Sequence, residues 1–307
     1  MCFSGDTIEL QSDYGGEYPA VGWFMHMANQ TNWRSQGDTA QGMYVAAADG
    51  TAYCWKNTPG ISTTLRFMDR GLAAFRASPP KPVQIKDEQL KEEFTRSPKP
   101  DSSVIQIFSR IRPVPEGADS RNYNIGRDYL WIYKNEVEEI VDAAKRKPEG
   151  FSLPDYVVAR IARYSLVDSI RGQPDFWDAG DVRVANFVAH RMPAGDDNQI
   201  RIGFRGIFKQ TTTWYTRGLE GKIEGEFKID GNTFKISRFR AYVNATAWGA
   251  SAWSNRGVPK GRFPIVFAMV EANDALSKDV PPGAVSRNMI YRHPEISDIA
   301  RHAANMK

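Results

Sequence analysis

A strict alternation of apolar and charged residues at positions 222–229 constrains the fold of this chain more than any other feature. The odd positions include Ile223, Phe227 and Ile229, and every even position is Lys or Glu. Successive side chains of a β-strand point to opposite faces, so this pattern predicts a strand with one buried face and one face in water. The segment therefore belongs to an antiparallel sheet.

The alternating strand is followed by a turn and by a return strand with an interrupted pattern. Residues 230–232 read Asp-Gly-Asn, which is the composition of a tight turn. Apolar residues resume at Phe234 and Ile236, but from Phe239 onward they fall on odd positions. Because a slip of one residue exchanges the two faces of a strand, we predict a β-bulge within residues 237–239.

Other segments of the second half also predict strands. Apolar and basic residues alternate over 200–209, and a shorter apolar run covers 182–188. Residues 263–270 are apolar on both faces, which predicts a central strand. We interpret 157–167 as a further strand because β-branched residues are frequent there. Strands at this spacing predict an antiparallel sandwich or open barrel over residues 151–307, with a short helix at its C-terminal end.

The first 150 residues mix helix and strand. Two β-prone runs flank an Asp-Gly pair at 49–50, which predicts a hairpin, and Leu65, Met68, Leu72 and Phe75 recur at helical spacing after it. The proline-rich stretch at residues 77–82 predicts extended chain. Beyond it the patterns predict, in order, a short helix at 87–94, a strand at 104–108 and an amphipathic helix at 131–145. The chain is therefore expected to have an α+β fold in three parts, which are an N-terminal segment at 1–78, a mixed α/β connector at 82–150 and the β domain at 151–307.

One stretch of the N-terminal segment resembles a known fold. Residues 37–52 read Gly-Asp-Thr-Ala-Gln-Gly-Met-Tyr-Val-Ala-Ala-Ala-Asp-Gly-Thr-Ala and, with the helix that ends near Phe75, resemble the closing hairpin and last helix of the thioredoxin-like fold. That family carries a Cys-x-x-Cys pair at a helix start and a cis-proline before the hairpin. This chain has neither, because Thr39 and Ala40 stand where the proline would be. The resemblance implies a small thioredoxin-like α/β piece, and a degenerate redox accessory protein as one alternative function.

A second resemblance covers the β domain. Residues 160–168, 171–173 and 181–183, together with Trp248-Gly249, are similar to the β-rich C-terminal region of uncharacterised bacterial proteins. The resemblance implies a shared fold over residues 154–275. Because such proteins are often exported, it favours an exported mature form without its leader over a cytoplasmic protein.

Composition and charge exclude several classes of protein. The net charge is +4 at pH 7, and Lys and Arg are spread along the chain, so nucleic acid is not an expected partner. No apolar run reaches the about 18 residues that a membrane span needs. Cys2 and Cys54 are too few for a disulfide scaffold or a Cys-rich zinc site, and they leave open either one disulfide or two free thiols. No cofactor motif is present, and none is expected.

Large rings and arginines gather in the predicted loops of the β domain. Loops at one end of a β scaffold are common binding sites, and exposed rings stack on sugars, bases or peptides. Alternatively, the tryptophans are buried and close the ends of the sheet. The candidate binding residues of these loops are Trp214, Tyr215, Arg217, Trp248, Trp253 and Arg256.

A predicted turn carries a second group of binding candidates. Arg163, Asp168 and Arg171 have the charges to bind an anion beside Tyr164. The alternative is a buried Arg–Asp pair that orders the turn.

Catalytic and metal-binding candidates have fewer partners. Removal of Met1 would expose the thiol and amine of Cys2, an arrangement of self-contained amidases, or would mark a lipidated N-terminus. Asp175 and Asp178 form a carboxylate pair suited to general acid–base work. On a helix Glu295, Asp298 and His302 would share one face that could hold a divalent ion, although a solvated helix end has the same composition.

The sequence therefore favours a non-catalytic binding or structural protein. Its aromatic and arginine loops would contact a protein or glycan partner. The alternatives are a hydrolase that uses Cys2 or the Asp175/Asp178 loop and the degenerate thioredoxin-like protein. The pattern leaves the oligomeric state open.

Overall fold

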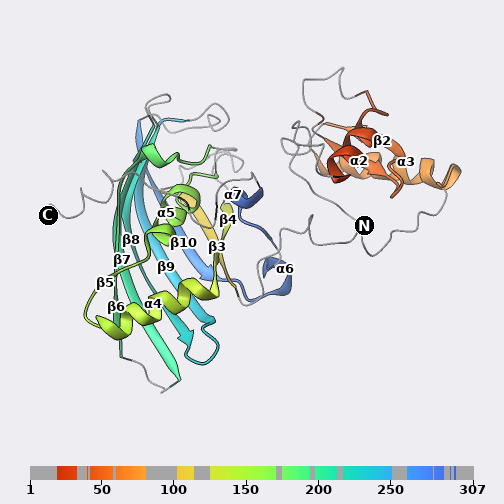
Figure 1. Cartoon of the computed structure of the whole chain (residues 1–307). Helices are drawn as coiled ribbons and strands as arrows, with labels where there is room; N and C mark the ends of the chain where they lie inside the picture. The colour runs from red at the N-terminus through yellow and green to blue at the C-terminus, as the bar shows by residue number, and fades with distance from the viewer. Residues whose placement is uncertain are drawn as a thin grey trace. The chain divides into compact units, whose positions relative to one another are not determined.

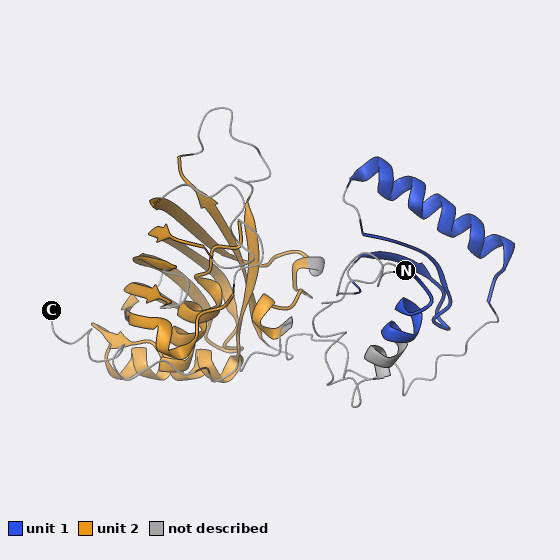
Figure 2. Cartoon of the chain, turned by 90° about the horizontal axis from the view of Figure 1, so that it is seen from above, with its two compact units in different colours: residues 1–96 blue, residues 97–307 orange. Residues whose placement is uncertain are grey.

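The chain folds into two compact units, Met1–Arg96 and Ser97–Lys307, which Figure 2 colours separately. Among the residues that the structure describes, the first unit holds a hairpin and the helices α2 and α3, and the second is built on one large sheet. The computed structural model describes residues 19–32, 40, 42–57, 60–80, 102–113, 125–170, 175–193, 198–212, 217–250, 261–278, 280–286, 291 and 294. The helix predicted at 87–94 and the one expected at the C-terminal end lie outside these residues.

A two-stranded antiparallel hairpin organises the first unit. Strands β1 (Met43–Ala46) and β2 (Ala52–Lys56) pair across a short turn and confirm the predicted hairpin. In that turn the Asp49 carboxylate accepts a hydrogen bond of 2.9 Å from the backbone N–H of Thr51. Helix α2 (Pro19–Ala28) buries Phe24 and Met27 in a small core with Tyr44 and Trp55 of the hairpin.

Helix α3 (Ile61–Ala77) confirms the helix predicted after the hairpin, but it packs through a different face. Phe67 and Gly71 are its buried residues, and a Cβ added to Gly71 would lie 2.6 Å from Cβ of Val45 in β1. The small size of Gly71 therefore decides which side approaches the hairpin. The apolar residues that revealed the helix are exposed, namely Leu65, Met68, Leu72 and Phe75.

The second unit is built on a single antiparallel sheet of eight strands (Figure 1). The strands lie in the order β4-β3-β10-β9-β8-β7-β6-β5, and within the described ranges no pairing closes the sheet between β4 and β5. It is therefore one open sheet and not a two-sheet sandwich. Residues 103–132, expected within a connector, add two strands to it. The strands are β3 (Ser103–Ile111), β4 (Gly126–Ile132), β5 (Phe151–Ser152), β6 (Val182–Met192), β7 (Gln199–Thr211), β8 (Gly218–Asp230), β9 (Ile236–Trp248) and β10 (Arg262–Glu271).

The β8–β9 hairpin confirms both the predicted turn and the predicted bulge. The Asp230 carboxylate accepts hydrogen bonds from the backbone N–H groups of Asn232 and Thr233, at 3.0 and 2.9 Å. The strand register shifts by one residue just beyond the turn and leaves Ser237 as the extra residue of β9. After the bulge the odd-numbered side chains of β9 are buried, as the shift in the apolar pattern required.

Two helices cover one face of the sheet (Figure 1). Helix α4 (Lys134–Arg146) buries Val137, Ile140, Val141 and Ala144 and confirms the predicted amphipathic helix, although residues 131–132 belong to β4. Helix α5 (Asp155–Arg160) continues into the π-helical turn η5 (Ile161–Ser165). Shorter pieces are η6 (Ala179–Asp181), α6 (Ala275–Lys278) and α7 (Gly283–Ser286). Within the described residues, no helix combines the length and the apolar character that crossing a membrane requires.

The strand predicted at 157–167 is wrong, because this segment is helical. Its β-branched residues Val157, Val158 and Ile161 are all buried. A continuous apolar run can belong to a buried helix as well as to a buried strand, and packing outweighs β-propensity. The segment lies against the sheet and does not extend it.

The core lies between the helices and the face of the sheet that they cover, which we call the inner face. Its largest side chains include Phe187, Phe204, Phe227 and Phe267. Gly206 lies directly opposite Phe187, and a Cβ at Gly206 would be 2.2 Å from the Phe187 ring. Residue 206 must therefore be glycine for the ring to lie flat across the strand.

Candidate binding surface

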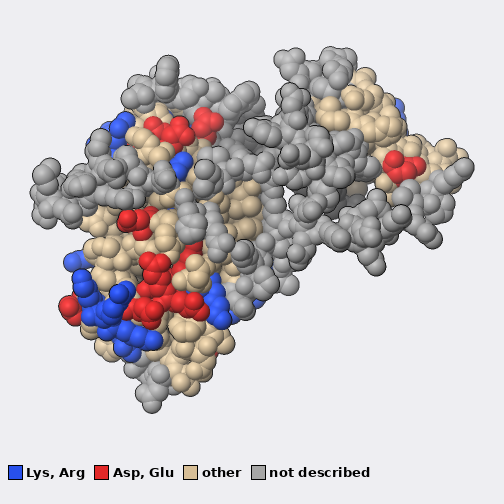
Figure 3. Space-filling view, viewed as in Figure 1, with Lys and Arg blue, Asp and Glu red and all other residues tan. Residues whose placement is uncertain are grey.

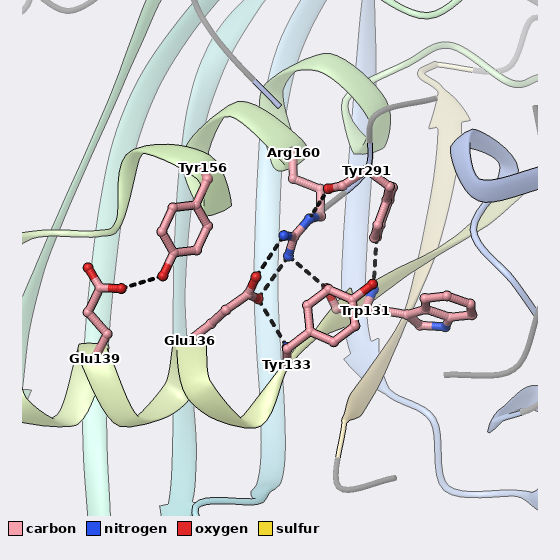
Figure 4. A network of polar contacts seen from close by, with 7 residues as sticks. All are labelled: Trp131, Tyr133, Glu136, Glu139, Tyr156, Arg160 and Tyr291. Carbon is pink, nitrogen blue, oxygen red and sulfur yellow. Dashed lines mark hydrogen bonds and ion pairs between the residues drawn. The ribbon is translucent and has the colours of Figure 1, made fainter. Parts of the chain in front are cut away.

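A buried ion pair joins the two helices on the inner face (Figure 4). The side chains of Arg160 and Glu136 are fully buried, and two hydrogen bonds of 2.7 and 2.8 Å join the guanidinium to the carboxylate. Arg160 also donates to the backbone carbonyls of Tyr291 at 2.8 Å and Trp131 at 3.1 Å. The backbone N–H of Tyr133 donates to Glu136 at 3.0 Å. Each guanidinium nitrogen thus has an acceptor, as a buried charge requires.

The same cluster forms hydrogen bonds with backbone groups of Trp131 in β4, the strand at the open edge of the sheet. The backbone N–H of Trp131 donates to the Tyr291 hydroxyl at 2.9 Å, while the Trp131 carbonyl accepts from Arg160. Burial raises the pKa of Tyr291 because a phenolate would lack solvation there. Unpaired strand edges invite pairing with other chains, so these contacts protect β4. The cluster therefore acts as a structural joint.

Arg163 and Asp168, two candidates for an anion site, both make hydrogen bonds to the backbone. Arg163 Nε donates to the Trp177 carbonyl at 2.9 Å, and its guanidinium lies 5.0 Å from the Tyr164 ring centroid. The buried Asp168 carboxylate accepts from the N–H of Ile170 at 3.1 Å. Arg163 thus holds the segment of Trp177 in place, and Asp168 orders its own turn.

Arg217 contacts the loop that carries Asp175 and Asp178, the two predicted catalytic carboxylates. Arg217 is buried, donates to the Asp175 carbonyl at 2.7 Å and stacks 4.0 Å from the Trp177 ring centroid. Asp178 precedes η6, and its N–H donates to the Asp181 carboxylate at 3.1 Å. Burial raises the pKa of Asp181, and Arg217 opposes that shift. The side chains of Asp175 and Asp178 are exposed.

Of the two cysteines, Cys54 lies within the described residues. The Cys54 thiol is free of a disulfide and donates to the Phe67 carbonyl at 3.4 Å, and burial raises its pKa. Within the part of the chain that the structure describes, no group of three or more His, Cys, Asp and Glu side chains could hold a metal ion. The candidates outside the described residues are Cys2, Arg171, Trp214, Tyr215, Trp253, Arg256, Glu295, Asp298 and His302.

Basic side chains gather on the side of the sheet that points away from α4 and α5, which we call the outer face. It consists of the strand positions that alternate with the buried ones in β3, β4 and β6–β10. Asp230 ends β8 at this side, but its carboxylate binds its own turn. The acidic residues of the outer face are Glu220, Glu224 and Glu226. The basic residues are Arg110, Arg127, Arg201, Arg205, Lys209, Lys222, Lys228, Arg238, Arg240 and Arg262.

Few of these basic side chains are neutralised. Arg201 pairs with Glu226 at 2.8 Å, and Glu220 pairs with both Lys209 and Arg262. Among the described residues, Glu224 is the one acidic side chain of the outer face that makes no ion pair. The basic residues that make none with any described residue are Arg110, Arg127, Arg205, Lys222, Lys228, Arg238 and Arg240.

Aromatic rings lie among these cations. Tyr242 is 48% exposed in the middle of β9. Trp248, at the end of β9, is half-buried and lies across Gly218, where a Cβ would come within 2.0 Å of the indole. The guanidinium of Arg262 stacks 4.0 Å from the Trp248 ring centroid. Arg127 lies over the ring of Phe108 at 5.9 Å. The outer face therefore combines cations with rings.

Comparison with known proteins found no match. No family model, no curated protein and no solved structure matches the chain. The resemblances to the thioredoxin-like fold and to uncharacterised bacterial proteins therefore stay predictions.

Proposed function

We propose that this protein is a non-catalytic binding protein that holds an anionic polymer on the outer face of its sheet. The observation that carries the proposal is the imbalance of charge, ten basic side chains against three glutamates. Cations without a paired acid create a positive potential that attracts a polyanion and orients it during approach. A sulfated glycan and a nucleic acid share the chemistry that this face would recognise.

The helix-covered side of the unit supports this choice of face by contrast. Acidic and basic side chains lie next to one another over α4 (Figure 3). The exposed acids Glu139 and Asp142 there precede the exposed cations Lys145, Arg146 and Lys147. Because the two signs are mixed, this side offers a polyanion no excess of cations. The proposed site therefore lies on the strands. Trp248, at the end of β9, and Arg262, at the start of β10, form one end of it.

Retention on immobilised heparin tests the proposal. The variant Arg205→Gln/Lys222→Gln/Arg240→Gln removes three outer-face cations and keeps side chains of similar length. We expect it to elute at distinctly lower salt than the wild type, because counterion release scales with the number of cations engaged. Chemical denaturation of the variant checks that it folds normally.

A matched control separates position from net charge. The variant Lys145→Gln/Arg146→Gln/Lys147→Gln removes the same charge from the end of α4 and should elute close to the wild type. Equal shifts for the two variants would show that only net charge matters. A wild-type protein that is not retained at about 0.15 M salt would also overturn the proposal.

A further inference from the structure

The aromatic rings on the outer face indicate which chemical class of anionic polymer this face binds. We infer that it is single-stranded nucleic acid, with a base stacked on Tyr242 and phosphates held by the surrounding cations. This inference rests on the proposed function, since it requires the outer face to bind a polyanion. Unlike a sulfated glycan, a nucleic acid has flat aromatic bases. The protein must therefore also offer an exposed aromatic ring on which a base can stack.

The strand register places Tyr242 in a row that crosses seven strands. Neighbouring strands lie about 4.8 Å apart, so the row extends for about 29 Å. Cations, rings and apolar groups share it, with Glu224 as the acidic member. From β6 to β4 the row reads Val188, Arg205, Glu224, Tyr242, Ala268, Phe108 and Arg127.

The surroundings of Tyr242 leave its ring open to a partner. Its neighbour in β10 is Ala268, whose side chain is too short to cover a phenol ring. Asn244, two positions further along the same face of β9, is exposed and carries an amide that can hydrogen-bond to a base edge. Stacking of a base on such a ring is worth about 1–3 kcal/mol.

Cations lie within two strands of this ring on the outer face. Arg240 lies two residues before Tyr242 in β9, and Lys222 pairs across the sheet with Asn244. Arg205 lies in the row of Tyr242, two strands away. None of the three cations makes an ion pair with a described residue. They are therefore placed to contact the phosphates that flank a stacked base.

A single strand fits this face better than a duplex does. The bases of a duplex are already stacked on each other, so their faces cannot reach Tyr242. Reading a duplex also requires an element that enters a groove, usually a helix or a two-stranded ribbon. The middle strands of a sheet cannot do so, whereas sheet faces with exposed rings do bind unpaired nucleotides.

Fluorescence anisotropy with a labelled single-stranded oligonucleotide tests the inference. The wild type should bind it more tightly than a duplex of the same sequence, with an affinity that falls as salt rises. Tyr242→Ala should weaken binding by roughly 5- to 150-fold, the equivalent of one lost stack. Tyr242→Phe keeps the ring and should bind like the wild type.

The outcomes distinguish this inference from the proposed function. If the wild type is retained on heparin but ignores the oligonucleotide, the nucleic-acid inference fails and polyanion binding stands. The inference also fails if Tyr242→Ala binds the oligonucleotide as tightly as the wild type does. If neither heparin nor oligonucleotide binds, both proposals are wrong.

Discussion

The two faces of the eight-stranded sheet use the same residue type in opposite ways. On the inner side Arg160 is fully buried, and each of its guanidinium nitrogens meets an acceptor. On the outer side Arg205 and Arg240 are exposed and make no ion pair with a described residue. A buried charge is tolerated only with partners, whereas a solvated one needs none. The inner arginine is therefore committed to the fold, and the outer ones are free for a partner.

The largest expected effect comes from breaking the inner pair. Arg160→Met removes the cation and leaves the Glu136 carboxylate buried without its partner. We expect the free energy of unfolding, measured by urea denaturation, to fall by about 3–5 kcal/mol. Adding Glu136→Met to this variant removes the stranded charge and should restore much of the loss.

The same substitution at an arginine of the outer face is the control for the loss of stability expected at Arg160. Arg240→Met has the same chemistry at an exposed position and should alter the free energy of unfolding by no more than about 0.5 kcal/mol. Equal losses at Arg160 and Arg240 would remove the distinction between the two faces.

Local patterns predicted the elements better than they predicted what the elements build. The alternation before Asp230 and the change of phase after Ile236 depend only on neighbouring residues, so the turn and the bulge at Ser237 followed from sequence. The strand prediction for residues 157–167 was wrong because the periodicity of apolar residues alone cannot separate a short buried helix from a buried strand. Similarly, the periodicity in α3 identified the helix but not the face that packs.

The candidate site could not be predicted for a related reason. Arg205, Lys222 and Arg240 each look like ordinary solvated positions of separate strands. Their proximity depends on strand order and register, which bring residues far apart in sequence onto one face. Because Lys and Arg are spread along the chain, the sequence predicted that nucleic acid is not a partner. The fold brings these side chains together on the outer face of the sheet. Conversely, Glu136 and Arg160 carry no sign in the sequence that they are buried together.

A smaller effect on the inner side tests the protection of the β4 edge. Tyr291→Phe removes the hydroxyl that accepts from the N–H of Trp131 and leaves that buried donor unsatisfied. We expect a loss of about 1–3 kcal/mol in the free energy of unfolding, with faster amide hydrogen exchange at Trp131. Tyr242→Phe, the same change on the outer face, should leave stability nearly unchanged. Unaltered exchange at Trp131 would show that the hydroxyl does not protect this edge.

The smallest effect concerns pH and uses the same tyrosine. Burial raises the pKa of Tyr291 above its ordinary value of 10.0, so the folded state keeps a proton that the unfolded chain releases. The associated stability is complete well below pH 10 and is lost as pH rises toward the pKa of the folded state. At about pH 10 half of the unfolded phenols are ionised, which costs about 0.4 kcal/mol at this one residue.

Phenylalanine at position 291 cannot ionise, so the stability gap between wild type and Tyr291→Phe should narrow by about 0.4 kcal/mol between about pH 8 and about pH 10. Urea denaturation at the two pH values measures that gap. Val188→Ala on the outer face introduces no change in ionisable groups, and its gap from the wild type should stay constant. A gap at position 291 that is constant or widens with pH would mean that the Tyr291 phenol is not held in its neutral form by burial. The inner face would then be more open to water than its contacts indicate, and its contrast with the outer face would be weaker.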